Sequence, residues 1–186
     1  IAIGRLPVTT GEELRRIVGR IASFESNHES MDALFTADRS TRDEFAAASR
    51  ALGQWVKAER KHEIDLNAES LEEARNRLFS IWENVDWMSY VGHGGIDRMA
   101  SEGLLTSEDV LTLAAMQSSP VVLAWSCNLQ RFDIPGTLSL GEQLMIDGAS
   151  PGVFSATGWS NHVETEAFRT AFTEAAFASD AETIGD

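Results

Sequence analysis

Short apolar runs alternate with longer amphipathic stretches along the chain. The apolar runs predict strands at residues 33–37, 63–66, 85–91, 121–125 and 152–156. Between them, apolar residues spaced three and four apart predict helices at 11–25, 42–60, 70–83, 106–116, 141–146 and 164–177. Strands that alternate with helices in this way are typical of a mostly parallel sheet covered by helices. The sequence therefore predicts an α/β fold in which residues 1–186 form one domain.

Composition narrows the classes of partner. The longest apolar stretch, residues 120–125, is far shorter than the ~20 residues that a membrane-spanning helix needs. The formal net charge of −14 lacks the basic excess that attracts phosphate backbones, so we expect no nucleic-acid partner. Residues 1–62 carry a net charge of +1 and residues 63–186 carry −15, so the acidity lies in the later part of the chain.

Three chemically competent residues come at the ends of predicted strands. Asp38, His93 and Cys127 each follow an apolar run, and in a parallel sheet the ends of the strands meet at one edge, where ligands bind. The 34 residues between His93 and Cys127 allow one helical crossover between adjacent strands. A cysteine nucleophile needs a nearby base, and an imidazole is the usual one. The pattern therefore favours a Cys-His pair.

The glycines after the histidine suit the same chemistry. Gly94 and Gly95 allow close approach of a substrate, and the N–H groups of Gly94 and Cys127 are candidate oxyanion donors. The alternative readings are that Cys127 fills the core and that His93 is an ordinary surface residue in a turn. The scattered histidines, at positions 28, 62, 93 and 162, show no zinc-type spacing with the single cysteine, so neither metal nor cofactor is predicted.

The chain resembles the gingipain-type family of caspase-like cysteine peptidases. The matching segments, in the family's order, are residues 3–7, 90–94, 102–105, 126–128 with Phe132, 139–142, and 152–153 leading to 158–159. The resemblance implies a caspase-like (flavodoxin-like) three-layer sandwich and a cysteine endopeptidase that forms a thioester. Cys127 is then the nucleophile, His93 the base and acid, and Asp38 the carboxylate near the histidine.

The resemblance also implies substrates, surroundings and location. Relatives that cleave after basic residues hold an acidic group in the S1 pocket, and Asp43 is the nearest positional match. We assign Gly95, Trp125, Ser126 and Trp159 to the substrate-binding surface. The family's sheet has strands before the apolar fragment at residues 1–3, and its final helix begins near residue 183, so we expect a piece of a larger protein whose remainder is a partner. A peptide or protein substrate and a secreted or cell-surface location are expected.

Two other functions stay open at this stage. A caspase-like module can be catalytically inactive, or can process only its own parent chain, and then serves in binding or scaffolding. The same pair of side chains can also support an esterase or a transpeptidase, because the acyl-enzyme accepts water or an amine.

Overall fold

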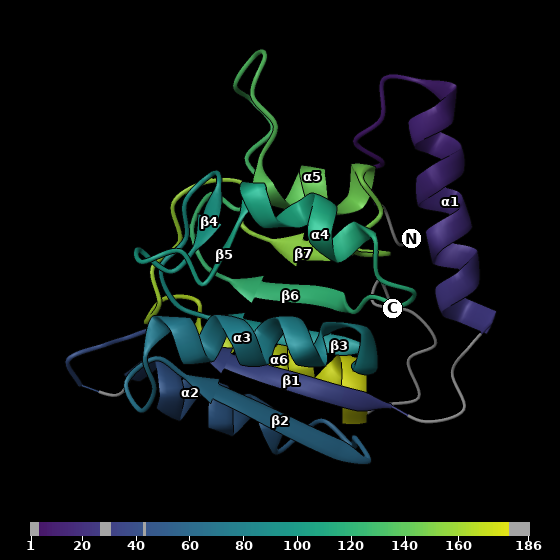
Figure 1. Cartoon of the computed structure of the whole chain (residues 1–186). Helices are drawn as coiled ribbons and strands as arrows, with labels where there is room; N and C mark the ends of the chain where they lie inside the picture. The colour runs from purple at the N-terminus through teal and green to yellow at the C-terminus, as the bar shows by residue number, and fades with distance from the viewer. Residues whose placement is uncertain (1–3, 27–30, 43, 179–186) are drawn as a thin grey trace.

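The computed structural model describes residues 4–26, 31–42 and 44–178, and it has helices on both sides of a parallel sheet (Figure 1). The strands are β1 (Asp32–Ala37), β2 (Arg60–Asp65), β3 (Trp87–Val91), β4 (Arg98–Met99), β5 (Leu105–Thr106), β6 (Val121–Trp125) and β7 (Val153–Ser155). The helices are α1 (Gly11–Ser26), α2 (Glu44–Gly53), α3 (Leu71–Ile81), α4 (Val110–Ala114), α5 (Leu140–Ile146) and α6 (Glu166–Ala178), with short 3₁₀ turns η1 (Trp82–Asn84) and η2 (Ser107–Asp109).

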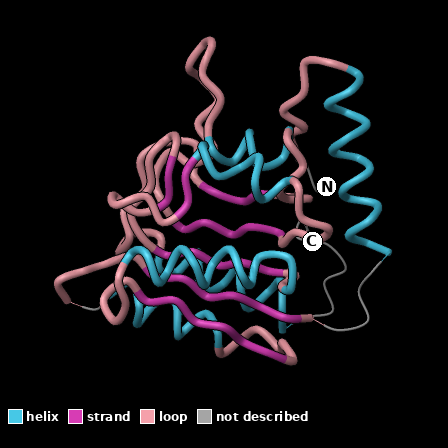
Figure 2. Tube along the Cα trace, in the orientation of Figure 1, coloured by secondary structure: helices cyan, strands magenta, loops and turns pink. Residues whose placement is uncertain are grey.

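The main sheet has five strands in the order β2-β1-β3-β6-β7, and all four pairings are parallel. Because a parallel pair needs a crossover, a helical segment intervenes between each strand and the next strand of this sheet. The three-layer α/β fold predicted from the sequence is thus confirmed. The loops after β3 and β6 gather at one edge of the sheet (Figure 2).

The two faces of the sheet carry different clusters of apolar side chains. One face packs against α3, α4 and α5 through a large cluster that includes Leu78, Trp82, Met88 and Tyr90. The other face packs against α2 and α6 through a smaller cluster rich in alanine and aromatic rings. We call these the aliphatic face and the aromatic face. No described helix has the length and apolar character to cross a membrane.

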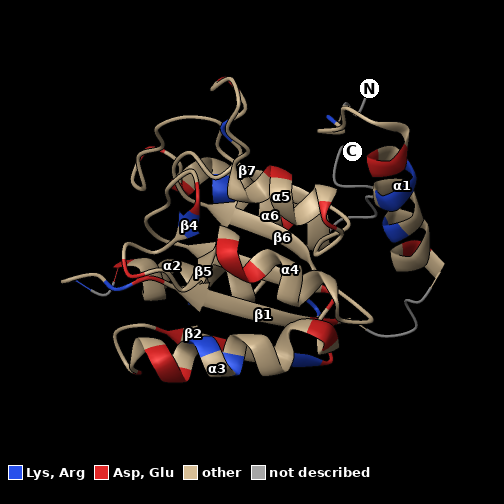
Figure 3. Ribbon diagram, turned by 45° about the horizontal axis from the view of Figure 1, so that its top comes forward, with Lys and Arg blue, Asp and Glu red and all other residues tan. Residues whose placement is uncertain are grey.

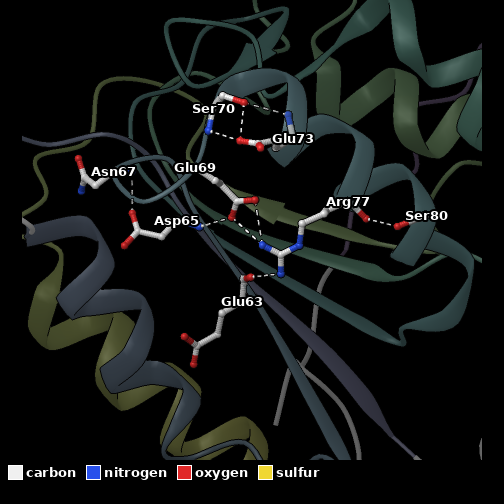
Figure 4. A network of polar contacts seen from close by, with 8 residues as sticks. All are labelled: Glu63, Asp65, Asn67, Glu69, Ser70, Glu73, Arg77 and Ser80. Carbon is white, nitrogen blue, oxygen red and sulfur yellow. Dashed lines mark hydrogen bonds and ion pairs between the residues drawn. The ribbon is translucent and has the colours of Figure 1, made fainter.

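Local polar contacts explain where α3 begins. Ser70 caps the helix: its side chain accepts from the N–H of Glu73, and the Glu73 carboxylate accepts from the N–H of Ser70. Arg77, one turn on, donates to both carboxylate oxygens of Glu69 and to the carbonyl of Glu63 at the end of β2 (Figure 4). These contacts fix the turn between β2 and α3, as the capping pattern in the sequence predicts.

Several predicted boundaries are corrected. The helix predicted for residues 42–60 ends at Gly53, because the chain turns there to reach β2, which starts at Arg60 rather than residue 63. The helix predicted for 106–116 is a 3₁₀ turn followed by the short α4. The β4–β5 pair was not predicted, since two-residue strands leave no periodic pattern. The predicted features at residues 1–3 and near residue 183 lie outside the described residues.

Candidate active site

Three adjacent strands bring the predicted catalytic residues to one edge of the sheet. Ala37, Val91 and Trp125 are register partners at the ends of β1, β3 and β6. Asp38 follows β1 directly, whereas His93 and Cys127 each lie two residues beyond their paired strand ends. The N–H of Gly92 still donates to the carbonyl of Trp125, so the two chains run together past the sheet. His93 and Cys127 therefore leave neighbouring strands at equivalent positions.

A buried tyrosine shapes the loop that carries His93. The hydroxyl of Tyr90 donates to the carbonyl of His93 at 2.5 Å and accepts from the N–H of Ala100 at 2.7 Å. Burial raises the pKa of Tyr90 well above its ordinary value, and the nearby charge of Asp38 raises it further. The hydroxyl thus keeps its proton and remains a donor. A Cβ at Gly92 would overlap Asp38 Cβ and lie 2.6 Å from the Tyr90 hydroxyl, so this position requires glycine.

Asp38 holds the backbone of the same loop. Its carboxylate is almost completely buried and accepts from the N–H of His93 at 2.9 Å and from the N–H of Arg39 at 2.7 Å. Burial raises the pKa of Asp38, while those two hydrogen bonds and the charge of His93 act in the opposite direction. The resemblance implies a carboxylate near the histidine. In the structure the Asp38 carboxylate lies there and accepts a hydrogen bond from the histidine's backbone N–H.

The thiol of Cys127 is half-buried and contacts a later loop. Sγ donates to the carbonyl of Ser160 at 3.2 Å, and the N–H of Ser160 points back to Sγ at 3.4 Å. Beside it, Asn128 adopts a positive φ of 56° and donates its N–H to the carbonyl of Gly158. Within the described residues, Sγ makes no hydrogen bond with the ring of His93. The loop at residues 156–160 therefore packs directly against the segment that contains the cysteine.

The two predicted oxyanion donors have free N–H groups. In the described part of the chain, neither the N–H of Gly94 nor that of Cys127 has a hydrogen-bond acceptor. The N–H of Gly95, by contrast, donates to the carbonyl of Arg98 at 2.9 Å. A Cβ on Gly94 would lie 2.6 Å from the carbonyl oxygen of Cys127 and 2.7 Å from Ser126 Oγ. The two backbones are thus in close contact, and the two free N–H groups belong to adjoining segments.

The residues assigned to substrate binding fall in different environments. Trp159 is 89% exposed, so its indole is open to solvent, and it precedes the serine whose backbone contacts Sγ. Trp125 packs edge-on against Phe168 and Phe172 on the aromatic face, which assigns it a packing role rather than the predicted binding role. Ser126 is buried, and its hydroxyl has no partner among the described residues, so it offers no exposed surface to a substrate.

Two predicted substrate-binding residues remain, Asp43 and Gly95. Asp43, the predicted S1 acid, lies outside the described residues. Gly95 lies in the loop after His93 as expected, but its N–H is already bonded to the carbonyl of Arg98, so it offers no N–H to a substrate. Among the described residues, no three His, Cys, Asp or Glu side chains are grouped so that they could hold a metal ion.

Sequence reasoning missed a group of side chains behind the histidine. The ring of Phe45 lies edge-on to His93, with centroids 5.1 Å apart, and also edge-on to His162, with centroids 5.0 Å apart. Nδ1 of His162 lies 3.4 Å from Nη1 of Arg169, which is buried in α6. The sequence held one signal: Arg169 interrupts the apolar side of the predicted helix next to Phe168.

Comparison with known proteins supplies the family. No curated protein and no solved structure matches the chain. The sequence model of Peptidase family C25 matches residues 1–186, the whole chain. The fold and the order of the matching segments agree with that result. The chain therefore belongs to peptidase family C25, the gingipain family of cysteine peptidases.

Proposed function

We propose that this chain is a cysteine endopeptidase in which Cys127 is the nucleophile and His93 the general base and acid. The observation that carries the proposal is the register of β3 and β6, which places both residues two positions beyond the pair Val91 and Trp125. Neighbouring parallel strands are ~4.8 Å apart, so side chains at these positions can reach one another. A cysteine paired with an imidazole is a standard activated nucleophile.

The chemistry follows from the groups at this edge. His93 takes the proton of the Cys127 thiol, and the thiolate attacks the carbonyl carbon of the scissile peptide bond. The N–H groups of Gly94 and Cys127 donate to the oxyanion that forms, since neither is used within the described fold. His93 then protonates the leaving amine, which leaves a thioester on Cys127. A water molecule, deprotonated by His93, hydrolyses the thioester and restores the thiol.

Other residues position this machinery and contact the substrate. Asp38 and Tyr90 hold the backbone of His93 from both sides, through the N–H and the carbonyl, so they act as positioning residues. Trp159, which precedes the serine that contacts Sγ, offers an exposed apolar side chain to a substrate. Cleavage after basic residues belongs to the proposal through Asp43, on the strength of the resemblance to relatives with an acidic S1 group.

The test combines cleavage with labelling of the thiol. The wild-type protein is expected to cleave members of a positional-scanning peptide library, and the Cys127→Ala variant none. Because Cys127 is the only cysteine, iodoacetamide labelling reports on it alone. We expect labelling at pH 7 to be faster than that of N-acetylcysteine, and the His93→Gln variant to remove the excess rate. Slow labelling together with cleavage that survives Cys127→Ala would refute the proposal.

One observation favours a second function. Sγ is engaged by both backbone groups of Ser160 and makes no hydrogen bond with the ring of His93. A site closed in this way suits a module that is inactive, or that acts only on its own parent chain. If the library yields no cleavage while the parent chain is cut in a manner that requires Cys127, self-processing is the function. Loss of both reactions would indicate a binding module.

A further inference from the structure

Helix α6 carries a buried cation that has no anionic partner within the part of the chain that the structure describes. Arg169 is 2% exposed, and its Nε is enclosed without any hydrogen-bond acceptor in the described residues. Its Nη1 contacts Nδ1 of His162 at 3.4 Å. Throughout the described part of the chain, no carboxylate comes within ion-pair distance of the guanidinium, and no aromatic ring lies beneath it. Glu44 and Glu166 are near enough to influence this pair through charge, but both are exposed.

A buried guanidinium in this state destabilises the protein on its own. It has lost its hydration, and neither a counter-charge nor a full set of acceptors replaces it. Burial accordingly lowers the pKa of Arg169, against the smaller opposing effect of Glu166. The cost disappears when an anion enters and accepts hydrogen bonds from the guanidinium. The arrangement is therefore suited to a bound anion.

The contact with Arg169 also fixes the proton on His162. A guanidinium can only donate, so Nδ1 of the ring must accept, and a neutral ring then carries its proton on Nε2. Burial lowers the pKa of His162, and the charge of Arg169 lowers it further, which keeps the ring neutral. The pair thus offers a cation and a neutral N–H donor, a combination that binds a carboxylate.

This pair lies next to the proposed catalytic residues. His162 comes two residues after Ser160, whose backbone contacts Sγ of Cys127. On its other side, the ring of Phe45 contacts both His162 and His93. The pair is therefore connected to both proposed catalytic residues, to Cys127 through the segment of Ser160 and to His93 through the ring of Phe45.

We propose that Arg169 and His162 form a binding position for one carboxylate of the substrate, the side chain of an Asp or Glu near the scissile bond. The inference rests on the proposed peptidase function. It adds a position for an acidic side chain of the substrate to the position for a basic side chain that Asp43 would bind. Residues 63–186 carry a net charge of −15, which repels polyanionic peptides. The expected ligand therefore has a single acidic residue flanked by neutral or basic ones. Figure 3 shows acidic and basic residues interspersed along the ribbons of α1 and α3, so neither helix is uniformly basic.

The test measures binding rather than cleavage, so that it does not depend on catalysis. Fluorescence anisotropy of Cys127→Ala protein is recorded with capped hexapeptides in which Glu or its neutral counterpart Gln occupies each position in turn. We expect at least tenfold tighter binding of the Glu peptide at one position. Adding Arg169→Gln should abolish that preference, and Arg169→Lys should retain part of it. Adding Arg131→Gln, which removes an exposed cation elsewhere, should leave the preference intact.

A stability measurement separates recognition from a structural role. Arg169→Met replaces an unpaired buried charge by an apolar side chain, so we expect an unchanged or higher Tm of the free protein. A clear drop in Tm would assign Arg169 to the fold and overturn the proposal. Equal binding of Glu and Gln peptides at every position, or a preference that survives Arg169→Gln, would also overturn it. Failure of the peptidase function would show instead as a lack of cleavage and slow labelling of Cys127, with binding still measurable.

Discussion

The two faces of the sheet are built from different side chains. On the aliphatic face, large residues such as Leu78, Trp82 and Met88 are fully buried in one continuous cluster. On the aromatic face, small residues such as Ala33 and Ala46 alternate with rings, and a cavity of about 10 Å³ lies between the sheet and helices α2 and α6. The aromatic face is therefore the less completely packed of the two.

The difference in packing suggests a division of roles, in which the aliphatic face provides stability and the aromatic face carries the residues proposed to recognise a ligand. Tyr90 extends from the aliphatic face to hold the loop of His93, so the rigid side of the protein positions the proposed base. Phe45, His162 and Arg169 belong to the elements on the aromatic face, where burial is incomplete and a charge has no partner. Looser packing on the aromatic face gives side chains room to adjust to a ligand. The well-packed aliphatic face supplies the stability that offsets the cost of this looser packing.

Matched truncations on the two faces give the largest expected effect. Leu78→Ala on the aliphatic face should lower the free energy of unfolding by about 4 kcal/mol, because the closely packed surroundings cannot collapse into the space. Leu52→Ala on the aromatic face should cost about 2 kcal/mol, because this side chain borders the existing cavity and has fewer contacts to lose. Urea unfolding measures both. Equal losses, or a larger loss at Leu52, would contradict the contrast between the faces.

At the edge of the sheet, the backbone at Gly94 lies too close to Cys127 to leave room for an added methyl group. Gly94→Ala places a methyl group within 2.7 Å of the backbone of Cys127 and of the side chain of Ser126, which must displace the proposed oxyanion donors. We expect kcat/KM to fall at least ~100-fold, the usual effect of losing one such donor. Gly152→Ala is the control, since nothing lies within 4 Å of a Cβ at that position. Similar losses at both glycines would show that general loop disturbance, not donor geometry, limits the activity.

The sequence predicted the strands of the main sheet and the helices between them. The strands leave apolar runs in the sequence, and the helices leave apolar residues spaced three and four apart. It also predicted that Asp38, His93 and Cys127 would lie at one edge, since only strand ends and the parallel rule are needed for that step. The sequence also assigned Trp125 to substrate binding, whereas in the structure its ring packs against Phe168 and Phe172. A side chain next to a catalytic residue in sequence points to the opposite face of a strand as often as toward the site.

The remaining features depend on contacts between distant segments. The contact of Cys127 with Ser160 and that of Phe45 with His162 each join residues more than thirty positions apart, which no local pattern encodes. Asp38 was expected near His93, and it contacts the backbone N–H of that residue, because the side chain is short and the loop turns tightly at Gly92. The buried cation in α6 was visible only as one basic residue on an apolar helix side.

An ion pair on the aliphatic face should have an effect of intermediate size on stability, and that effect should depend on pH. Arg75 donates to both oxygens of Asp109 and to the carbonyls of Gly103 and Leu104, which ties α3 to the segment before α4. Partial burial raises the pKa of Asp109, but the hydrogen bonds from Arg75 and Thr106 outweigh it and lower the pKa below the ordinary 3.8.

Asp109→Asn should therefore cost about 1–2 kcal/mol of unfolding free energy at pH 7. A lowered carboxyl pKa stabilises the fold fully above the ordinary value and loses that effect as the pH falls through the folded value. The difference between wild type and variant should thus shrink below pH 3.8. Urea unfolding across pH 3–7 measures it, with Asp133→Asn, at an exposed pair with Arg131, as the control that should show no comparable loss. A difference that persists at low pH would mean that Asp109 acts through shape and not charge.

The smallest expected effect is a gain in stability, and it concerns the cavity on the aromatic face. Ser89 lies on β3 and lines the cavity, and its hydroxyl is buried without a partner among the described residues. A cavity of about 10 Å³ is at the limit for one water, and its mostly apolar lining offers few partners. Ser89→Ala should therefore raise the unfolding free energy by about 0.5–1 kcal/mol, since it removes an unsatisfied polar group. Ser150→Ala is the opposite control: this buried hydroxyl has one proton to donate to the carbonyl of Pro120 or of Gly152 and accepts from the N–H of Gly152, so its loss should cost about 1–2 kcal/mol. If Ser89→Ala instead destabilises the protein, the cavity holds a water bound to that serine, and the aromatic face is packed more completely than its side chains alone indicate.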